Sequence, residues 1–500
     1  MKQTERAQLE RMLKAELQGT VDRQKRIEGQ GMHPLVLSSR FEHRDEFGTG
    51  ANAPWLIVDM GKGYLPRNSD YNRGVRYIGA DFEDAMSAIS MAAHELLRDV
   101  VKINGVEILF EGRDIYHYYP EEAPPERLRS YQPDTNRFTT NGTVVVAAGH
   151  GVYLHYDSAC GTPWCPQRDQ HNGIVEDFIT PAYADELSHW LIERSHETLG
   201  AIARPRSQSP ELHTASGHPW WQMGARYALE AAFPTEAEIW ASLPSSPEAN
   251  REALEDIRSR PKFANHIKAA TLLHLHTNAS ENTTITGTRV YYQTGRPADS
   301  SLGNSILCYM KELIQAQGPY EDYYVATAAE PNNKGKNRLA EMPSVIVESG
   351  FHTNPSDAAA LKDPAFRTAA MKGVEKGYRL HAEGEPCKEF RVTDIPMIGA
   401  GSNPPGKYVP LLAHYEGYPQ LPATIEIETL HCPAGVECED GTYPTMGTES
   451  PLLFPFRCGG DPPEQQIIEF RARLTDADGV RTEWHEGSFT CMGMVFPDVS

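Results

Sequence analysis

The sequence lacks long hydrophobic runs, and it is poor in positive charge. No apolar stretch in its 500 residues approaches the roughly 18–20 residues that span a bilayer, so we expect no membrane span. It contains 47 Lys and Arg against 68 Asp and Glu, which gives a formal net charge of −21. Such an acidic surface repels phosphate backbones and anionic lipids. The composition therefore argues against a nucleic-acid partner and against docking on a membrane through basic residues.

Cysteine is scarce, with only 8 residues, but most of the cysteines lie close to another one. An even number with local pairing predicts disulfides and an oxidising compartment, while the spacing leaves their connectivity open. Residues 1–5 are charged and lack the apolar core of a secretory signal, which leaves either a cytosolic location or a leader removed from this sequence. The cysteines favour the second, so we expect a periplasmic or secreted protein. The neighbours are Cys160 and Cys165, Cys432 and Cys438, and, in one C-terminal region, Cys458 and Cys491.

The length predicts about three domains, at roughly 150 residues each. Residues 1–140 mix helical and strand patterns, which predicts an α+β region of unknown role. In 141–385, buried strand-like runs alternate with helical patterns, which predicts an α/β domain with a mostly parallel twisted sheet flanked by helices. In 386–500, Pro and Gly become frequent and alternating patterns surround an Asp478-Gly479 turn, which predicts a small all-β domain of sandwich type. The elements expected in the α/β domain are strands at 144–147, 269–275, 290–292 and 345–347, and helices near 181–198, 301–316 and 364–380.

The first chemical signal lies just after the strand at 144–147, because open α/β sheets place their sites at the carboxyl ends of strands. Here His150 stands between Gly149 and Gly151. The glycines let the backbone bend closely around a bound ion and leave the imidazole exposed. The alternative is a turn between two glycines with an incidental histidine.

Two histidines lie at the end of the strand at 269–275. His274 and His276 are two residues apart, so they point to the same face of a strand. Two imidazoles on one face at a strand end are typical metal ligands. The alternative is one hydrogen-bonded core histidine and one surface histidine.

Two carboxylates complete the set of candidates. Glu348 ends the buried run at 345–347, where lost solvation raises the pKa of a carboxyl group and makes it a candidate general base or acid. A structural, ion-paired glutamate is the alternative. Glu176 lies just before a helix that we expect Thr180 to cap and Pro181 to open. Its position alone does not distinguish it from Asp177, Asp185 and Glu186.

Taken in order, these segments resemble the zinc-dependent N-acetylmuramoyl-L-alanine amidases of the type-3 amidase family. That family has a strand ending in Gly-His-Gly, a Glu that opens the next helix and an Arg-x-x-x-Ala-Asn stretch. A strand ending in His-x-Asn-Ala and a Pro-x-Val-Leu-Val-Glu-x-Gly-Phe-x-x-Asn block come after these. The resemblance covers about 141–382, with an insertion around Cys160 and Cys165. The matching stretches are 149–151, Glu176, Arg260 with Ala264-Asn265, 276–279 and 343–354.

The resemblance implies a site and a reaction. One Zn²⁺ would be held by His150, Glu176 and His276, and Glu348 would be the catalytic general base that acts on a zinc-activated water. The reaction would cleave the amide bond between N-acetylmuramic acid and the L-alanine of the stem peptide in peptidoglycan. The residues expected to support the ligands or to line the substrate are His274, Asn278 and Asn354.

Two other functions stay open at this point. One is a zinc peptidase that cuts within the stem peptide, and the other is a cell-wall-binding protein without turnover. Retention of all four site residues argues against the second, because binding alone does not need Glu348. The expected partner is peptidoglycan, and regulation by an activator protein or by the flanking regions is open.

Overall fold

The structure is a computed structural model that describes residues 3–44, 53–66, 77–125, 142–396, 408–457, 459–460 and 466–491. The chain divides into two compact units. Met1–Met310 with Tyr324–Glu385 forms the first, and Lys311–Tyr323 with Pro386–Ser500 forms the second. Within the described ranges, no helix is both long and apolar enough to cross a bilayer.

A six-stranded sheet forms the centre of the first unit, in the order β10-β9-β11-β8-β4-β7. Strands β9 and β11 are antiparallel, and the other neighbouring strands are parallel. The predicted α/β class with a mostly parallel sheet is therefore confirmed for this segment, with one antiparallel pair added. The strands are β4 (Gly142–Ala148), β7 (Leu199–Ala203), β8 (Thr271–Asn278), β9 (Arg289–Tyr292), β10 (Glu330–Pro331) and β11 (Ser344–Phe351).

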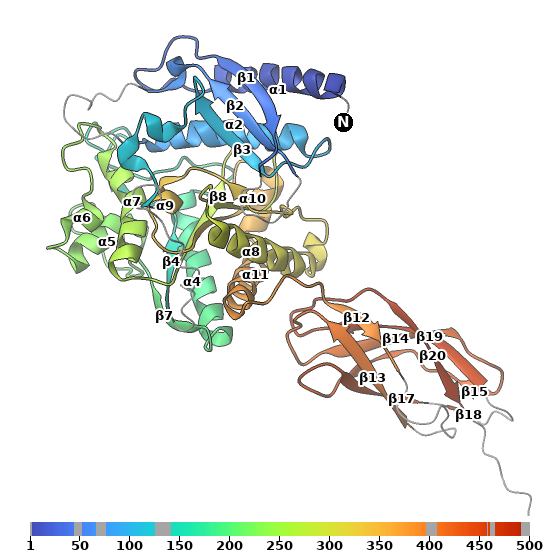
Figure 1. Ribbon diagram of the computed structural model, residues 1–500. Helices are drawn as coiled ribbons and strands as arrows, with labels where there is room; N and C mark the ends of the chain where they lie inside the picture. Colours follow the sequence, from blue (N-terminus) through green and yellow to red (C-terminus); the bar gives the residue numbers. More distant parts are fainter. Residues whose placement is uncertain are drawn as a thin grey trace, which may run out of the picture. The chain divides into compact units, whose positions relative to one another are not determined.

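Helices cover this sheet, as Figure 1 shows. Helix α4 packs on β4, β7 and β8, and α11 packs on α4. Helices α5, α6 and α7 form a separate group. The short strands β5 (Tyr153–Leu154) and β6 (Trp164–Cys165) precede α4. The helices are α4 (Glu176–Arg194), α5 (Ala225–Ala232), α6 (Ala237–Trp240), α7 (Arg251–His266), α8 (Pro297–Gln315), α9 (Gly335–Arg338), α10 (Pro355–Lys362) and α11 (Pro364–Glu383).

Helix α4 begins earlier than the sequence predicts. It starts at Glu176, so Pro181 lies inside the helix rather than at its start. A proline has no N–H to donate to the carbonyl of the residue four positions before it. That carbonyl, of Asp177, instead accepts a hydrogen bond from Arg206 at 3.0 Å. The hydroxyl of Thr180 does not cap the helix but donates to the carbonyl of Gly149 at 2.9 Å.

The N-terminal part of this unit has its own small sheet, in the order β1-β2-β3. Strands β1 and β2 are antiparallel, whereas β2 and β3 are parallel. Helices α1 and α2 share one hydrophobic core with this sheet. The other side of α2 faces the larger sheet, because Met91 packs with Ile285 and Phe351 (Figure 1). The elements are α1 (Gln3–Arg23), β1 (Val36–Glu42), β2 (Trp55–Met60), α2 (Ala80–Leu97) and β3 (Gly105–Phe110).

The second unit is built from strands that enclose one core. Its main sheets have the orders β12-β13-β17 and β16-β14-β19-β20. Alternate residues of β19, from Ile468 to Leu474, are buried in a core that also contains residues of β13 and β17. The strands are β12 (Arg391–Asp394), β13 (Tyr408–Glu416), β14 (Thr424–His431), β15 (Val436–Glu437), β16 (Gly441–Pro444), β17 (Leu452–Arg457), β18 (Gly459–Gly460), β19 (Gln466–Thr475) and β20 (His485–Cys491).

Disulfides join the two closest cysteine pairs, as the spacing suggested. Cys160 is bonded to Cys165, and Cys432 is bonded to Cys438. Cys491 is disulfide-bonded as well, whereas Cys458 lies outside the described residues. The expected boundary between residues 140 and 141 also lies outside them.

Candidate metal centre

The candidate site begins where β4 ends. His150 is 1% exposed and adopts a left-handed backbone conformation, with φ of 55°. Few residues other than glycine adopt this conformation, and those that do are often at functional sites. The residue before it, Gly149, passes close to His276. A Cβ atom at Gly149 would lie 2.3 Å from Cε1 of His276, so only glycine leaves room for that ring.

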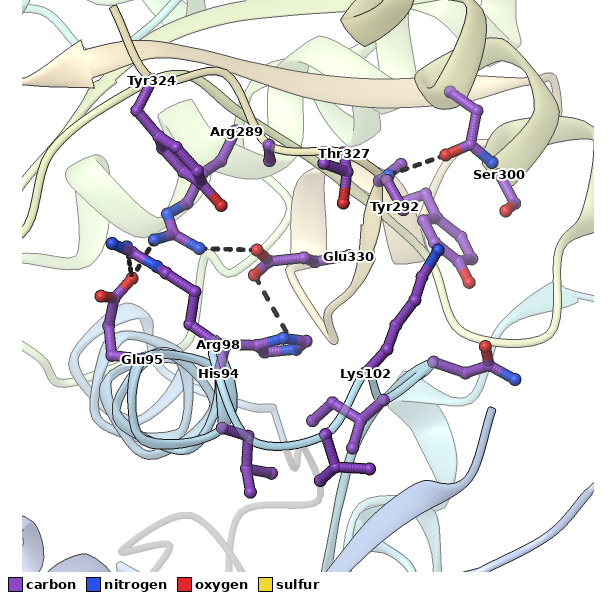
Figure 2. A pocket seen from close by; sticks show the side chains of 18 of the residues that line it. His94, Glu95, Arg98, Lys102, Arg289, Tyr292, Ser300, Tyr324, Thr327 and Glu330 are labelled. Atoms are coloured by element: carbon purple, nitrogen blue, oxygen red, sulfur yellow. Dashed lines mark hydrogen bonds and ion pairs between the residues drawn. The ribbon is translucent and has the colours of Figure 1, made fainter. Parts of the chain in front are cut away.

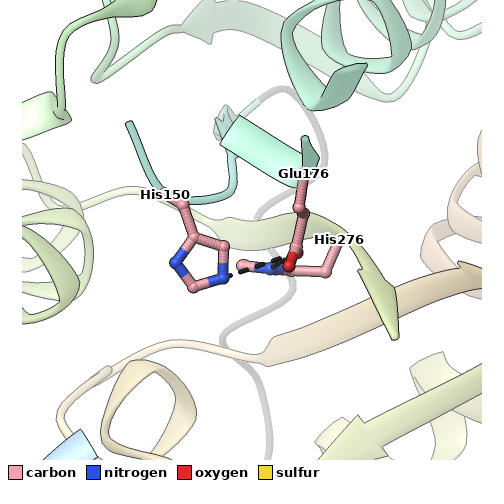
Figure 3. A group of neighbouring side chains, drawn as sticks. All are labelled: His150, Glu176 and His276. Atoms are coloured by element: carbon pink, nitrogen blue, oxygen red, sulfur yellow. Dashed lines mark hydrogen bonds and ion pairs between the residues drawn. The ribbon is translucent and has the colours of Figure 1, made fainter. Parts of the chain in front are cut away.

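Three buried side chains, from the turn after β4, from α4 and from β8, meet at this point (Figure 3). Glu176 Oε1 lies 2.6 Å from Nδ1 of His276 and 3.4 Å from Nε2 of His150. The two imidazole rings stand at 82° with their centroids 4.8 Å apart. One potential ligand atom from each residue lies within 4.8 Å of the others. The structure thus brings together the three residues that the sequence suggested as metal ligands.

The protonation states of this cluster suit a cation. Burial, together with the charge of Arg168, lowers the pKa of His150 to about 3. Burial and the ammonium of Lys336 lower the pKa of His276 well below its usual value. Burial opposes ionisation of Glu176, but the two histidines outweigh it and lower the pKa of Glu176. Metal ligation requires neutral imidazoles and an ionised carboxylate, and this is the state that these shifts favour.

The second nitrogen of His150 is held by a closed ring of hydrogen bonds. His150 Nδ1 lies 3.0 Å from Gln167 Oε1, and the Gln167 amide donates to Asp256 at 2.7 Å. Asp256 is paired with Arg260 at 2.8 Å, and Arg260 donates to the carbonyl of His150 at 2.6 Å. Partners of this kind fix the orientation of a metal-binding imidazole.

Asp177, which the sequence position alone did not distinguish from Glu176, is not part of the three-residue cluster. Its carboxylate accepts hydrogen bonds from the backbone N–H groups of Gly151, Gln167 and Arg168, at 2.8, 2.7 and 3.1 Å. It therefore ties the turn around His150 to the segment that carries Gln167. The neighbouring Cys160–Cys165 disulfide lies in the same insertion.

Glu348 lies beside the cluster, directly opposite His276 in the register of β11 and β8. Burial, reinforced by the charge of Glu176, raises the pKa of Glu348 to about 8. Its Oε2 atom is enclosed and makes no hydrogen bond within the described part of the chain. Lys336 lies nearby, with Nζ 2.8 Å from Nε2 of His276, and burial lowers the pKa of Lys336 to about 7.

The three remaining candidates lie on β8 and at the start of α10. His274 is fully buried two residues before His276 on β8. Asn278 ends β8 and donates to the hydroxyl of Tyr291 at 3.1 Å. Asn354 caps helix α10, because its Oδ1 accepts from the N–H groups of Ser356 and Asp357 at 2.9 and 3.1 Å. In this structure, the Asn354 side chain has a local structural role.

The N-terminal region supplies charged groups that the sequence did not single out. Asp84, on α2, binds Arg168 at 3.1 Å and also binds Lys334. Its neighbour Glu83 accepts from the N–H of Gly335 at 3.0 Å and from Arg338 at 2.8 Å. No local pattern links these carboxylates to a site some 80 residues further on, so only the folded chain reveals them.

The fold and the site together define a class of protein, namely α/β domains with a three-residue cluster that could hold a metal ion at the carboxyl edge of the sheet. Comparison with known proteins narrows this class. Residues 144–378 match the family model described as N-acetylmuramoyl-L-alanine amidase. This match lies in the segment whose motifs predicted a resemblance to the type-3 amidases.

Two curated relatives from Bacillus subtilis (strain 168) are similar to parts of the chain. The N-acetylmuramoyl-L-alanine amidase LytC is 28% identical over 143 residues, which are 29% of this chain and 27% of LytC. A germination-specific N-acetylmuramoyl-L-alanine amidase is 23% identical over 128 residues, 26% of this chain and 51% of that protein. The matches thus span about a quarter and about half of these relatives.

Solved structures also align with about half of the chain. The catalytic domain of CwlV from Bacillus (Paenibacillus) polymyxa var. colistinus is 18% identical, with a TM-score of 0.30, over 48% of this chain and 98% of that one. CwlD from Clostridioides difficile, in complex with the GerS lipoprotein, is 17% identical, with a TM-score of 0.33, over 49% of this chain and 100% of CwlD.

Proposed function

We propose that this protein is a zinc-dependent peptidoglycan amidase. It cleaves the amide bond between N-acetylmuramic acid and the L-alanine of the stem peptide. The observation that carries the proposal is the convergence of His150, Glu176 and His276 within 4.8 Å, in a segment that matches the amidase family. The two curated relatives bear the name of this activity.

The donor set fits a zinc ion. Two imidazole nitrogens and one carboxylate oxygen are a common set of three protein ligands in catalytic zinc sites. His150 Nε2, His276 Nδ1 and Glu176 Oε1 are the atoms that would hold the ion. When bound, zinc supplies Lewis-acid chemistry, which polarises an amide carbonyl and lowers the pKa of a water molecule.

Glu348 is the general base in this proposal. Its enclosed Oε2 has no partner in the described residues, so it is free to accept the proton of the attacking water. Burial raises the pKa of Glu348, which makes its ionised carboxylate a stronger base, and the protonated group then delivers the proton to the leaving nitrogen. Gln167 fixes the His150 ring meanwhile, which keeps the ligand atoms in place during the reaction.

The proposed substrate implies a location outside the cytoplasm, in the periplasm or the medium, where peptidoglycan lies. The disulfides Cys160–Cys165 and Cys432–Cys438 support this, because such bonds persist in oxidising compartments.

Mass spectrometry of the products from purified peptidoglycan tests the proposal. We expect stem peptides with a free L-alanine amino group and glycan with a free lactyl carboxylate, formed with zinc and not after chelation. Cleavage within the stem peptide would instead identify a peptidase. Binding to peptidoglycan without any zinc-dependent product would identify a binding protein.

A further inference from the structure

A cavity of about 410 Å³ lies in the first unit between the end of α2, strand β9, the start of α8 and the segment at 324–330 (Figure 2). Its walls combine charged groups with the side chains of Tyr292, Ser300 and Thr327. Both the N-terminal region and the amidase segment contribute to it, so neither part forms it alone.

Positive charge dominates this cavity. Its lining includes four cationic side chains, Arg44, Arg98, Lys102 and Arg289, and two carboxylates, Glu95 and Glu330. Arg44 is paired with Glu42 and Glu107, which do not line the cavity, so the excess positive charge of the lining is that of Lys102, in a chain whose net charge is −21. Such a local reversal of sign favours an anionic ligand.

The arginines are already ordered. Arg289 is 2% exposed and binds Glu95 and Glu330, yet its Nε atom has no hydrogen-bond partner in the described residues. Arg98 pairs with Glu95 and stacks over Tyr324, 4.6 Å from the ring centroid. The guanidinium groups therefore lose little side-chain freedom when a ligand binds.

Lys102 is the cation that remains available. Its exposed side chain points into the cavity in Figure 2, and its ammonium makes no ion pair within the described ranges. A carboxylate that enters the cavity would meet Lys102 and the guanidinium groups behind it. Charge-assisted hydrogen bonds of this kind are among the stronger polar contacts in proteins.

In the order of the sheet, Arg289 of the cavity lies two strands from His276 of the candidate metal centre. In the register of the sheet, His276 on β8 is opposite Glu348 on β11, which is opposite Arg289 on β9. Opposed residues point to the same face, and neighbouring strands are about 4.8 Å apart. The Cα atoms of Arg289 and His276 are thus about 10 Å apart along one face of the sheet. About three residues of an extended peptide cover this distance.

We propose that this cavity is a subsite for a carboxylate of the stem peptide, about three residues beyond the cleaved amide bond. The inference rests on the proposed function, because it takes the peptide as the substrate. Lys102, Arg98 and Arg289 would bind the carboxylate, and the N-terminal region would thereby contribute to substrate selection. The subsite acts on binding and leaves the chemistry at Glu348 unchanged.

Isothermal titration calorimetry on the full chain tests the subsite. The probes are the tripeptide L-alanyl-γ-D-glutamyl-L-lysine, the same peptide with both α-carboxylates amidated, and inorganic phosphate. We expect the acidic peptide to bind more tightly than the amidated one. For Lys102→Gln, affinity for the acidic peptide should fall about three- to tenfold, since an exposed cation contributes less than a buried one. Affinity for the amidated peptide should not change.

Lys62→Gln is the matched control, because Lys62 is an exposed lysine of the same region that does not line the cavity. Equal binding of the two peptides, or wild-type binding by Lys102→Gln, would overturn the subsite. Displacement of the peptide by an equal concentration of phosphate would overturn its assignment to carboxylates.

Steady-state kinetics separate this inference from the proposed function. If the protein is an amidase with this subsite, Lys102→Gln raises KM for muropeptides, while kcat and zinc content stay at wild-type values. If it hydrolyses muropeptides with an unchanged KM in Lys102→Gln, the subsite fails and the amidase function stands. If it binds the acidic peptide in the way described but releases no product, the function fails and the subsite stands.

Discussion

A single methyl group at Gly149 should disrupt the metal centre. In Gly149→Ala, the new Cβ would lie 2.3 Å from Cε1 and 2.5 Å from Nδ1 of His276. Ordinary contacts begin near 3.4 Å, so the ring would have to move by about 1 Å. It has no free space to enter, because His276 is 3% exposed and its Nε2 already contacts Lys336 at 2.8 Å.

This clash should destabilise the metal-bound state more than the metal-free state. Metal–nitrogen distances tolerate only about 0.2 Å of change, whereas a metal-free ring is able to rotate away. Overpacking of a buried site costs about 1–3 kcal/mol, and each 1.4 kcal/mol is a factor of ten in affinity. We therefore expect the zinc affinity of Gly149→Ala to fall about tenfold to a hundredfold.

Competition with a chromophoric chelator measures this affinity directly, and thermal unfolding with and without zinc reports the coupled stability. Gly79→Ala is the control, because a Cβ atom at Gly79 would meet nothing within 4 Å and its φ of −72° suits alanine. Wild-type zinc affinity in Gly149→Ala would refute the assignment of His276 as a ligand in the observed geometry.

Three further substitutions test other parts of the reasoning. Glu348→Gln should retain zinc but lose about 10²–10⁴-fold in kcat, as removal of a general base does. Metal analysis measures the zinc content and steady-state kinetics measure kcat. An active variant would exclude Glu348 as the base. Gln167→Leu should weaken zinc binding about tenfold to a hundredfold, because it removes the partner of His150 Nδ1. The control is Gln208→Leu, at an exposed amide, which should leave the zinc affinity unchanged in the same chelator titration. Arg338→Leu should lower the free energy of unfolding by about 3–5 kcal/mol, because it leaves buried Glu83 without its cation and leaves Glu122 with Arg258 alone. Arg40→Gln, which removes an exposed ion pair, should lower the free energy of unfolding by less than about 1 kcal/mol in denaturant unfolding. Equal losses for Arg40→Gln and Arg338→Leu would contradict the role of burial.

The edge strands β7 and β10 and the helices α5, α6 and α7 were not predicted from the sequence. Strands β4, β8, β9 and β11 were predictable because they are continuous apolar runs. For the same reason, His150, His276 and Glu348 could be placed at strand ends. Glu176 needed the family resemblance, since the residues around it include other carboxylates. The early start of α4 was missed because Pro181 normally marks a helix start, and its effect here is offset by Arg206, which binds the freed carbonyl of Asp177.

The supporting residues could not be predicted, for a physical reason. Gln167 reaches His150 only because Asp177 binds the backbone of both segments, and Lys336 reaches His276 from the short helix α9. Such contacts depend on how loops fold back over the sheet and carry no periodic signal in the sequence. The antiparallel pairing of β9 with β11 is of the same kind, because short buried strands look alike in either direction.

The ion pairs between α2 and the amidase segment limit how far the protein can be shortened for expression. A fragment limited to 144–378 would retain Arg338, which is 1% exposed in the intact unit, without Glu83 and Glu122. It would also retain Lys334 without Asp84. A fragment cut at the ends of the family match would therefore contain cations without their carboxylate partners. It would also expose the hydrophobic surface around Phe351. Recombinant versions of this protein should keep residues 3–125 joined to the amidase segment.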